Sequence, residues 1–73
     1  MKVGKYEISQ VIVTAAEAYT TRGRSFTFHD VQAFLVRRGV DPDPAYRAAD
    51  RIVQRMRKLG RIQFNGKTWQ VKP

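Results

Sequence analysis

The sequence contains no cysteine and a single histidine, His29, among its 73 residues. Without cysteine the chain forms neither disulfides nor thiolate-bound zinc, and one histidine is too few to build a metal site. No apolar run approaches the ~18 residues that span a bilayer, and the amino terminus lacks the apolar stretch of a secretory signal. We therefore expect a cytoplasmic protein that needs no metal or other cofactor and makes no contact with membranes.

Acidic residues are scarce in the second half of the chain. Residues 1–45 hold six basic and five acidic side chains, whereas residues 46–73 hold eight basic side chains and one acidic, Asp50. The last 28 residues thus carry +7 of the total formal charge of +8. Nine of the fourteen bases are arginine, whose guanidinium suits bidentate contacts with phosphate and guanine. This one-sided distribution predicts a polyanionic partner.

The length predicts one domain over residues 1–73, and hydrophobic periodicity predicts that it begins with two helices. The first spans about Lys5 to Thr20 and is followed by a loop over residues 21–24. The second runs from about Phe28 to Arg38 and ends at Gly39. Its amino terminus carries a predicted capping box, in which Thr27 is the N-cap and Asp30 returns a carboxylate. A short strand is expected at Ser25-Phe26.

A third helix is predicted over about residues 44–59, with Asp43 as its N-cap and Pro44 as its first residue. One face of this helix is apolar, formed by Ala45, Ala48, Ala49, Ile52, Met56 and Leu59. The opposite face carries Tyr46, Arg47, Asp50, Arg51, Gln54, Arg57 and Lys58. Gly60 ends the helix.

The last residues predict a β-hairpin, in which strands 61–64 and 67–71 flank a two-residue type I′ turn at Asn65-Gly66. Folding there places Ile62 opposite Trp69 and Phe64 opposite Lys67. Ile62, Phe64, Trp69 and Val71 then share one face, and we expect Ile62 and Trp69 to pack on the core.

The order of these elements, helix, short strand, helix, tight turn, helix and hairpin, resembles the winged helix-turn-helix superfamily over essentially the whole chain. The residues that carry the resemblance are Phe26-Thr27, Asp30-Val31, Leu35, Gly39-Val40, the run from Leu59 to Ile62, Asn65-Gly66 and Trp69. The third helix is also similar to the recognition helix of the carboxy-terminal winged domain of bacterial DNA translocases, through Tyr46 to Ala49, Arg51 to Val53, Met56 and Gly60. Because this sequence has no motor domain, that second likeness implies DNA binding alone. The expected fold is an α+β winged helix-turn-helix.

The resemblance implies that the third helix enters the major groove and that the wing, residues 61–71, contacts the DNA backbone. Arg47 and Arg51 lie four residues apart and are predicted to reach guanine edges, and Gln54 is predicted to pair with adenine. Asp50 is expected to orient one of these arginines or to accept from a cytosine amino group. The predicted DNA-binding residues are Tyr46, Arg47, Asp50, Arg51, Gln54, Arg57, Lys58 and Lys67.

The sequence therefore predicts a double-stranded DNA-binding module without enzymatic activity, such as a small bacterial or phage transcriptional regulator. A homodimer is expected, because one domain of this size buries a modest interface on a single half-site. Two alternatives stay open at this point. One is a non-specific nucleic-acid or RNA-binding accessory factor, and the other is a winged-helix adaptor for an acidic protein. His29 is expected to be a first-turn helix residue rather than a catalytic base.

Overall fold

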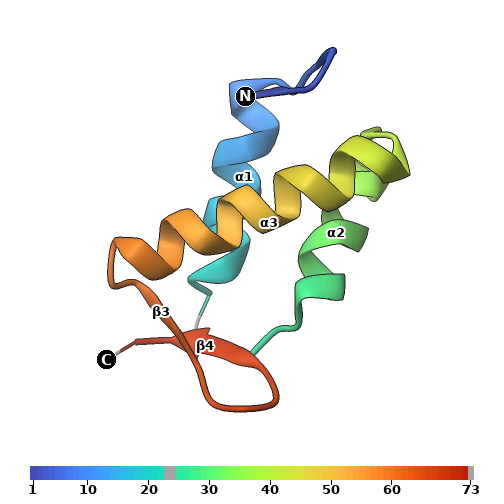
Figure 1. The fold of residues 1–73 in the computed structure, drawn as a ribbon. Helices are drawn as coiled ribbons and strands as arrows, with labels where there is room; N and C mark the ends of the chain where they lie inside the picture. The colour runs from blue at the N-terminus through green and yellow to red at the C-terminus, as the bar shows by residue number, and fades with distance from the viewer. Residues whose placement is uncertain (23–24, 73) are drawn as a thin grey trace.

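The computed structural model describes residues 1–22 and 25–72, and these form three helices and two small antiparallel sheets (Figure 1). In chain order the elements are β1 (Lys2–Val3), β2 (Tyr6–Glu7), α1 (Gln10–Thr20), α2 (Phe28–Arg37), α3 (Pro42–Lys58), β3 (Ile62–Phe64) and β4 (Trp69–Val71). The expected α+β class is confirmed, and the layout is consistent with a winged helix. The loop expected over residues 21–24 falls partly outside the described residues. Within the described ranges, no helix combines the length and apolar character that crossing a membrane requires.

The three helices pack against one another around a single hydrophobic core. Each helix contributes one buried side, and the first strand and the last hairpin close the two ends of the core. The largest fully buried side chains include Val13 of α1, Leu35 of α2, Ile52 of α3, Val3 of β1 and Ile62 of β3. Helix α3 supplies the broadest contribution, because its successive turns place small or branched apolar residues on the same side.

The first helix begins later than its hydrophobic pattern predicts. Residues 2–7 form an amino-terminal hairpin, with Lys2 opposite Glu7 and Val3 opposite Tyr6. Gly4 makes the turn possible because its φ of 60° is a left-handed conformation that glycine adopts without strain. Helix α1 then starts at Gln10, after the Ser9 side chain accepts a hydrogen bond from the Val11 amide at 3.2 Å. The predicted start at Lys5 is therefore wrong.

The capping box of α2 is confirmed. The Thr27 hydroxyl accepts from the Asp30 amide at 3.1 Å, and the Asp30 carboxylate accepts from the Thr27 amide at 2.8 Å. At the other end Gly39 has a φ of 95°, and the Val40 amide donates back to the Leu35 carbonyl at 3.1 Å. This is the Schellman arrangement, and it turns the chain tightly from α2 into α3.

Helix α3 begins two residues earlier than predicted, at Pro42, with Asp41 in the N-cap position. The prediction of Asp43 as the N-cap is wrong, and Asp43 lies in the first turn. Pro44 is tolerated there because the first backbone amides of a helix have no intrahelical acceptor, so its missing N–H costs no hydrogen bond. Its ring is also fully buried. At the other end Leu59 is 57 % exposed, against the prediction, because it is the C-cap residue and lies beyond Met56, the last residue of α3 that is buried.

The carboxy-terminal hairpin forms with a shifted register. Ile62 pairs with Val71, Gln63 with Gln70 and Phe64 with Trp69. The predicted pairs, Ile62 with Trp69 and Phe64 with Lys67, are therefore wrong, and the turn is centred one residue later, on Gly66-Lys67. Asn65 does not take the positive φ of a type I′ turn; only Gly66 does, at 98°. The Asn65 side chain instead accepts from the amides of Lys67 and Thr68.

The shift spans two residues of register, so the same side chains still share one face of the hairpin. On that face Ile62 is buried, Trp69 is half-buried and packs against the core, and Phe64 is 55 % exposed. The expected strand at Ser25-Phe26 is a single bridge, in which the backbone of Phe26 exchanges two 2.8 Å hydrogen bonds with Trp69. This bridge joins the wing (residues 61–71, which include β3, β4 and their turn) to the start of α2.

Candidate nucleic-acid interface

The structure brings seven of the eight predicted site residues together on the solvent side of α3. One side of the helix packs on the core through Ala45, Ala48, Ala49, Ile52, Val53 and Met56, so the opposite side faces solvent. The exposed members are Tyr46, Arg47, Asp50, Arg51, Arg57 and Lys58, and Gln54 is half-buried. Lys67, the eighth, is exposed on the turn of the wing.

The two arginines in the first half of α3 both lie against the amino-terminal hairpin. The Arg51 guanidinium donates to the backbone carbonyl of Lys2. The Nη1 atom of Arg47 lies 3.1 Å from the position that a Cβ on Gly4 would occupy. Sequence reasoning missed this contact, because a hairpin of two-residue strands leaves almost no periodic signal. The only cue was Gly4 before a lysine.

Asp50 does not orient an arginine in the way the sequence suggested. In the described part of the chain neither Arg47 nor Arg51 forms an ion pair with it, and the partner of Arg51 is a carbonyl of β1. Asp50 is therefore an exposed negative charge with no basic partner within ion-pair distance among the described residues.

Tyr46 lies toward α2, with the centre of its ring 5.2 Å from that of Phe28 in an edge-to-face arrangement.

The basic residues in the second half of α3 make no described contact with the amino-terminal hairpin, unlike those in the first half. The Arg57 Nε donates to the Gln54 side-chain oxygen at 2.9 Å, which holds both groups on the exposed side. Arg55 is drawn the other way, toward α1, where its Nε lies 3.6 Å from the Glu17 carboxylate. Lys58 is exposed in the last turn. Arg57 and Lys58 are thus the bases of this half that face solvent without an acidic partner in the described ranges.

The wing adds further positive charge next to that end of the helix. Arg61 is exposed at the exit from α3, and Lys67 is exposed on the turn. The backbone amide of Lys67 donates a 3.0 Å hydrogen bond to the Asn65 side chain, which holds the backbone of Lys67 in place. From residue 54 to residue 67 the sequence contains five basic side chains and no acidic one. We call this stretch the basic segment.

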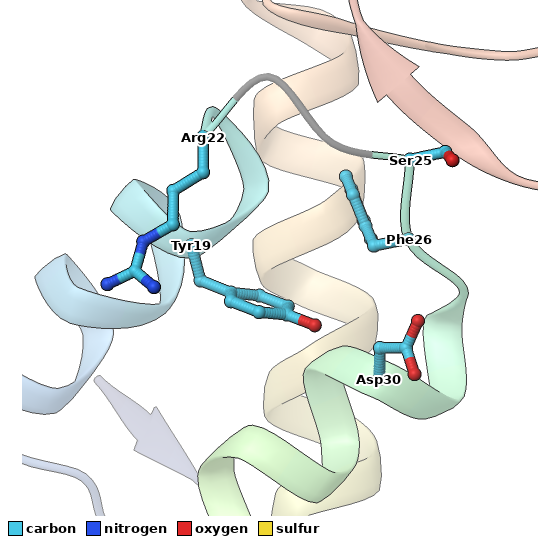
Figure 2. A pocket seen from close by; sticks show the side chains of 5 residues that line it. All are labelled: Tyr19, Arg22, Ser25, Phe26 and Asp30. Atoms are coloured by element: carbon cyan, nitrogen blue, oxygen red, sulfur yellow. The ribbon is translucent and has the colours of Figure 1, made fainter.

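A pocket among the described residues lies away from this surface (Figure 2). Its volume is about 490 Å³, and it lies between the end of α1 and the start of α2, lined by Tyr19, Arg22, Ser25, Phe26 and Asp30. The Asp30 carboxylate is already an acceptor in the capping box. Across the described residues, no group of three or more histidine, cysteine, aspartate or glutamate side chains is placed to hold a metal ion.

Comparisons with protein-family profiles, with curated proteins and with solved structures found no significant match.

Proposed function

We propose that this chain is a winged helix-turn-helix module that binds double-stranded DNA through the exposed side of α3 and the wing. The observation that carries the proposal is the basic segment. Four of its five bases are exposed without an acidic partner in the described structure, and they come from a helix and an adjoining hairpin. A solvated helix face normally mixes both signs of charge, whereas a surface for phosphate excludes acids.

The two kinds of DNA contact divide along α3. Arg57, Lys58 and Lys67 supply positive charge at the carboxy-terminal end, where they suit phosphates on either side of a groove. Arg47 and Gln54 lie near the middle of the exposed side, where a helix seated in the major groove meets base edges. The side-chain oxygen of Gln54 accepts from Arg57 and keeps a second lone pair. The side-chain nitrogen of Gln54 donates to no group in the described structure, so it can donate to a base.

A module of this kind needs no enzymatic chemistry, and its biological role would be that of a small transcriptional regulator. One 17-residue helix reads few base pairs, so we propose that two copies act on two half-sites.

The test is a salt titration of duplex binding by fluorescence anisotropy. If about five bases neutralise phosphates, the logarithm of affinity falls against the logarithm of salt with a slope of roughly −4 to −5 per copy. A slope near zero, or no duplex binding at low salt, overturns the proposal. Preference for single-stranded RNA over duplex, or tight binding to an acidic protein without DNA affinity, would favour an RNA-binding factor or an adaptor instead.

A further inference from the structure

A second lysine-bearing hairpin lies beside α3, on the other side of the helix from the wing. In Figure 1 α3 runs between the amino-terminal hairpin (residues 2–7) and the wing. Lys2 and Lys5 are exposed on this hairpin. We propose that the amino-terminal hairpin is a second contact element for the DNA backbone, in which Lys2 and Lys5 bind phosphates. This inference rests on the proposed function.

The hairpin is fixed to the body of the domain. The Val3 side chain is fully buried in the core, and Ile8, directly after β2, is buried there as well. Because side chains alternate along a strand, the burial of Val3 directs Lys2 away from the core. The hydrogen bond from Arg51 to the Lys2 carbonyl joins β1 directly to α3. Lys2 is therefore held at a defined place next to the exposed side of the helix.

The position of Arg47 brings any bound duplex close to the hairpin. Its Nη1 atom lies 3.1 Å from the Cβ position of Gly4. A charge-assisted hydrogen bond adds about 2.8 Å, so an acceptor bound by that atom lies within about 6 Å of the same Cβ position. Lys5 is the next residue and is exposed. DNA that Arg47 contacts is thus within reach of the Lys5 side chain.

The lysines have no competing partner in the described structure. Glu7 is opposite Lys2 in the hairpin, but its carboxylate lies 3.1 Å from the amino group of Met1, and no ion pair joins it to Lys2 or Lys5. The Lys5 ammonium lies 5.8 Å from the centre of the Tyr6 ring, a weak contact that leaves its charge accessible. Glu7 itself would repel a nearby phosphate, which gives the proposal a second test of opposite sign.

Arg51 acquires a role that differs from reading a base. Its guanidinium positions the hairpin against α3, so it controls whether Lys2 and Lys5 are presented to the duplex. Removal of the Arg51 side chain should therefore reduce the contribution of the two lysines even though both are still present.

The experiment measures random-duplex affinity and its salt slope for Lys2→Ser/Lys5→Ser, with Arg37→Ser/Arg38→Ser on the end of α2 as a control of equal net charge. Removing one lysine–phosphate interaction weakens binding roughly five- to tenfold at about 0.1 M salt and makes the slope shallower by about 0.9. We expect the lysine variant to bind roughly 25- to 100-fold more weakly, while the control changes little. Glu7→Gln should bind about twofold more tightly.

The link to Arg51 is tested by repeating the lysine substitutions in an Arg51→Ala background. Their effect should shrink to a few-fold there, and the amides of β1 and β2 should exchange with solvent faster in Arg51→Ala alone. Arg51→Lys, which keeps a donor, should restore part of the effect. If the wild type binds duplex with the expected slope and Lys67→Ala weakens it, but Lys2→Ser/Lys5→Ser binds as the wild type does, the hairpin proposal fails and the proposed function stands. If the wild type does not bind duplex, both fail.

Discussion

The first part of α3 and the basic segment that follows it present opposite charge to solvent. Residues 41–51 hold three carboxylates, Asp41, Asp43 and Asp50, against two arginines, and both arginines lie on the amino-terminal hairpin. Residues 54–67 hold five bases and no acid, and one of the five, Arg55, is paired with α1. A recognition helix usually inserts its first turns deepest into the groove. Here the carboxylates weaken general attraction at that end, so we infer that the bases of the basic segment supply affinity and that the first part of α3, together with Gln54, supplies selectivity.

The largest expected effect comes from the basic segment. Arg57→Ser/Lys58→Ser should weaken binding to every duplex by roughly 25- to 100-fold at about 0.1 M salt and make the salt slope shallower by about 2. Both side chains are exposed, so thermal stability should change little. Anisotropy with preferred and random duplexes measures this. Unequal reductions on the two duplexes would show that these bases read sequence and would contradict the division between the two parts.

The next effect belongs to Arg47. Arg47→Ala should cost about 1–3 kcal/mol on the preferred site and flatten the preference at one base pair, with a smaller reduction on random duplex. The preferred site is first obtained by selection from a random-duplex pool, and the selection is then repeated with the variant. Lys58→Ala is the matched control: Arg57 is hydrogen-bonded to Gln54, whereas Lys58 has no such contact in the described structure, so its loss should weaken both kinds of duplex alike. If Arg47→Ala keeps the full preference, α3 does not read sequence at this position.

A gain is expected from Asp50. Asp50→Asn removes a negative charge that has no basic partner among the described residues, so random duplex should bind about two- to fivefold more tightly. If Asp50 accepts from a cytosine amino group, the same variant should also discriminate less at that base pair. Weaker binding to random duplex would mean that Asp50 supports the surface in a way that its lack of partners does not reveal.

The smallest effect should come from Arg55, although it lies inside the basic segment. Its side chain is 63 % exposed and paired with Glu17, so Arg55→Ala should change affinity by less than about twofold and unfolding free energy by less than about 1 kcal/mol. The neighbouring Arg57→Ala should cost roughly five- to tenfold in affinity. Equal reductions of affinity in the two variants would show that Arg55 leaves Glu17 to bind DNA. The ion pair would then not make the role of Arg55 different from that of Arg57.

Sequence patterns correctly predicted the structural features that depend only on residues close together in the sequence. The Thr27 and Asp30 capping box and the end of α2 at Gly39 are local hydrogen-bonding arrangements, and both were predicted correctly. The solvent side of α3 was predicted from its apolar period. Leu59 is the exception, because the period does not show where along the helix the contact with the core ends.

The features that sequence patterns missed depend on contacts between distant residues or on near-equivalent alternatives. The Arg51 hydrogen bond joins residues 49 positions apart, and no periodicity encodes it. The wing turn could be centred on either of two adjacent positions, because both keep Ile62 and Trp69 on one face. In the observed turn the Asn65 side chain accepts from the amides of Lys67 and Thr68, an arrangement that the Asn-Gly pair alone does not specify.

Because both positions of the wing turn keep the same side chains on one face, the length of the wing can change in steps of one residue pair. If both strands of the hairpin gain or lose one residue at the tip, the tip moves while Ile62 and Trp69 stay on the same face of the sheet. A one-residue change in only one strand instead moves the side chains of that strand to the opposite face. The attachment to the core at Ile62 and at the Phe26–Trp69 bridge lies away from the tip. Related proteins could therefore differ in wing reach by whole pairs of residues, and an engineer could extend the tip toward another phosphate without redesigning the core.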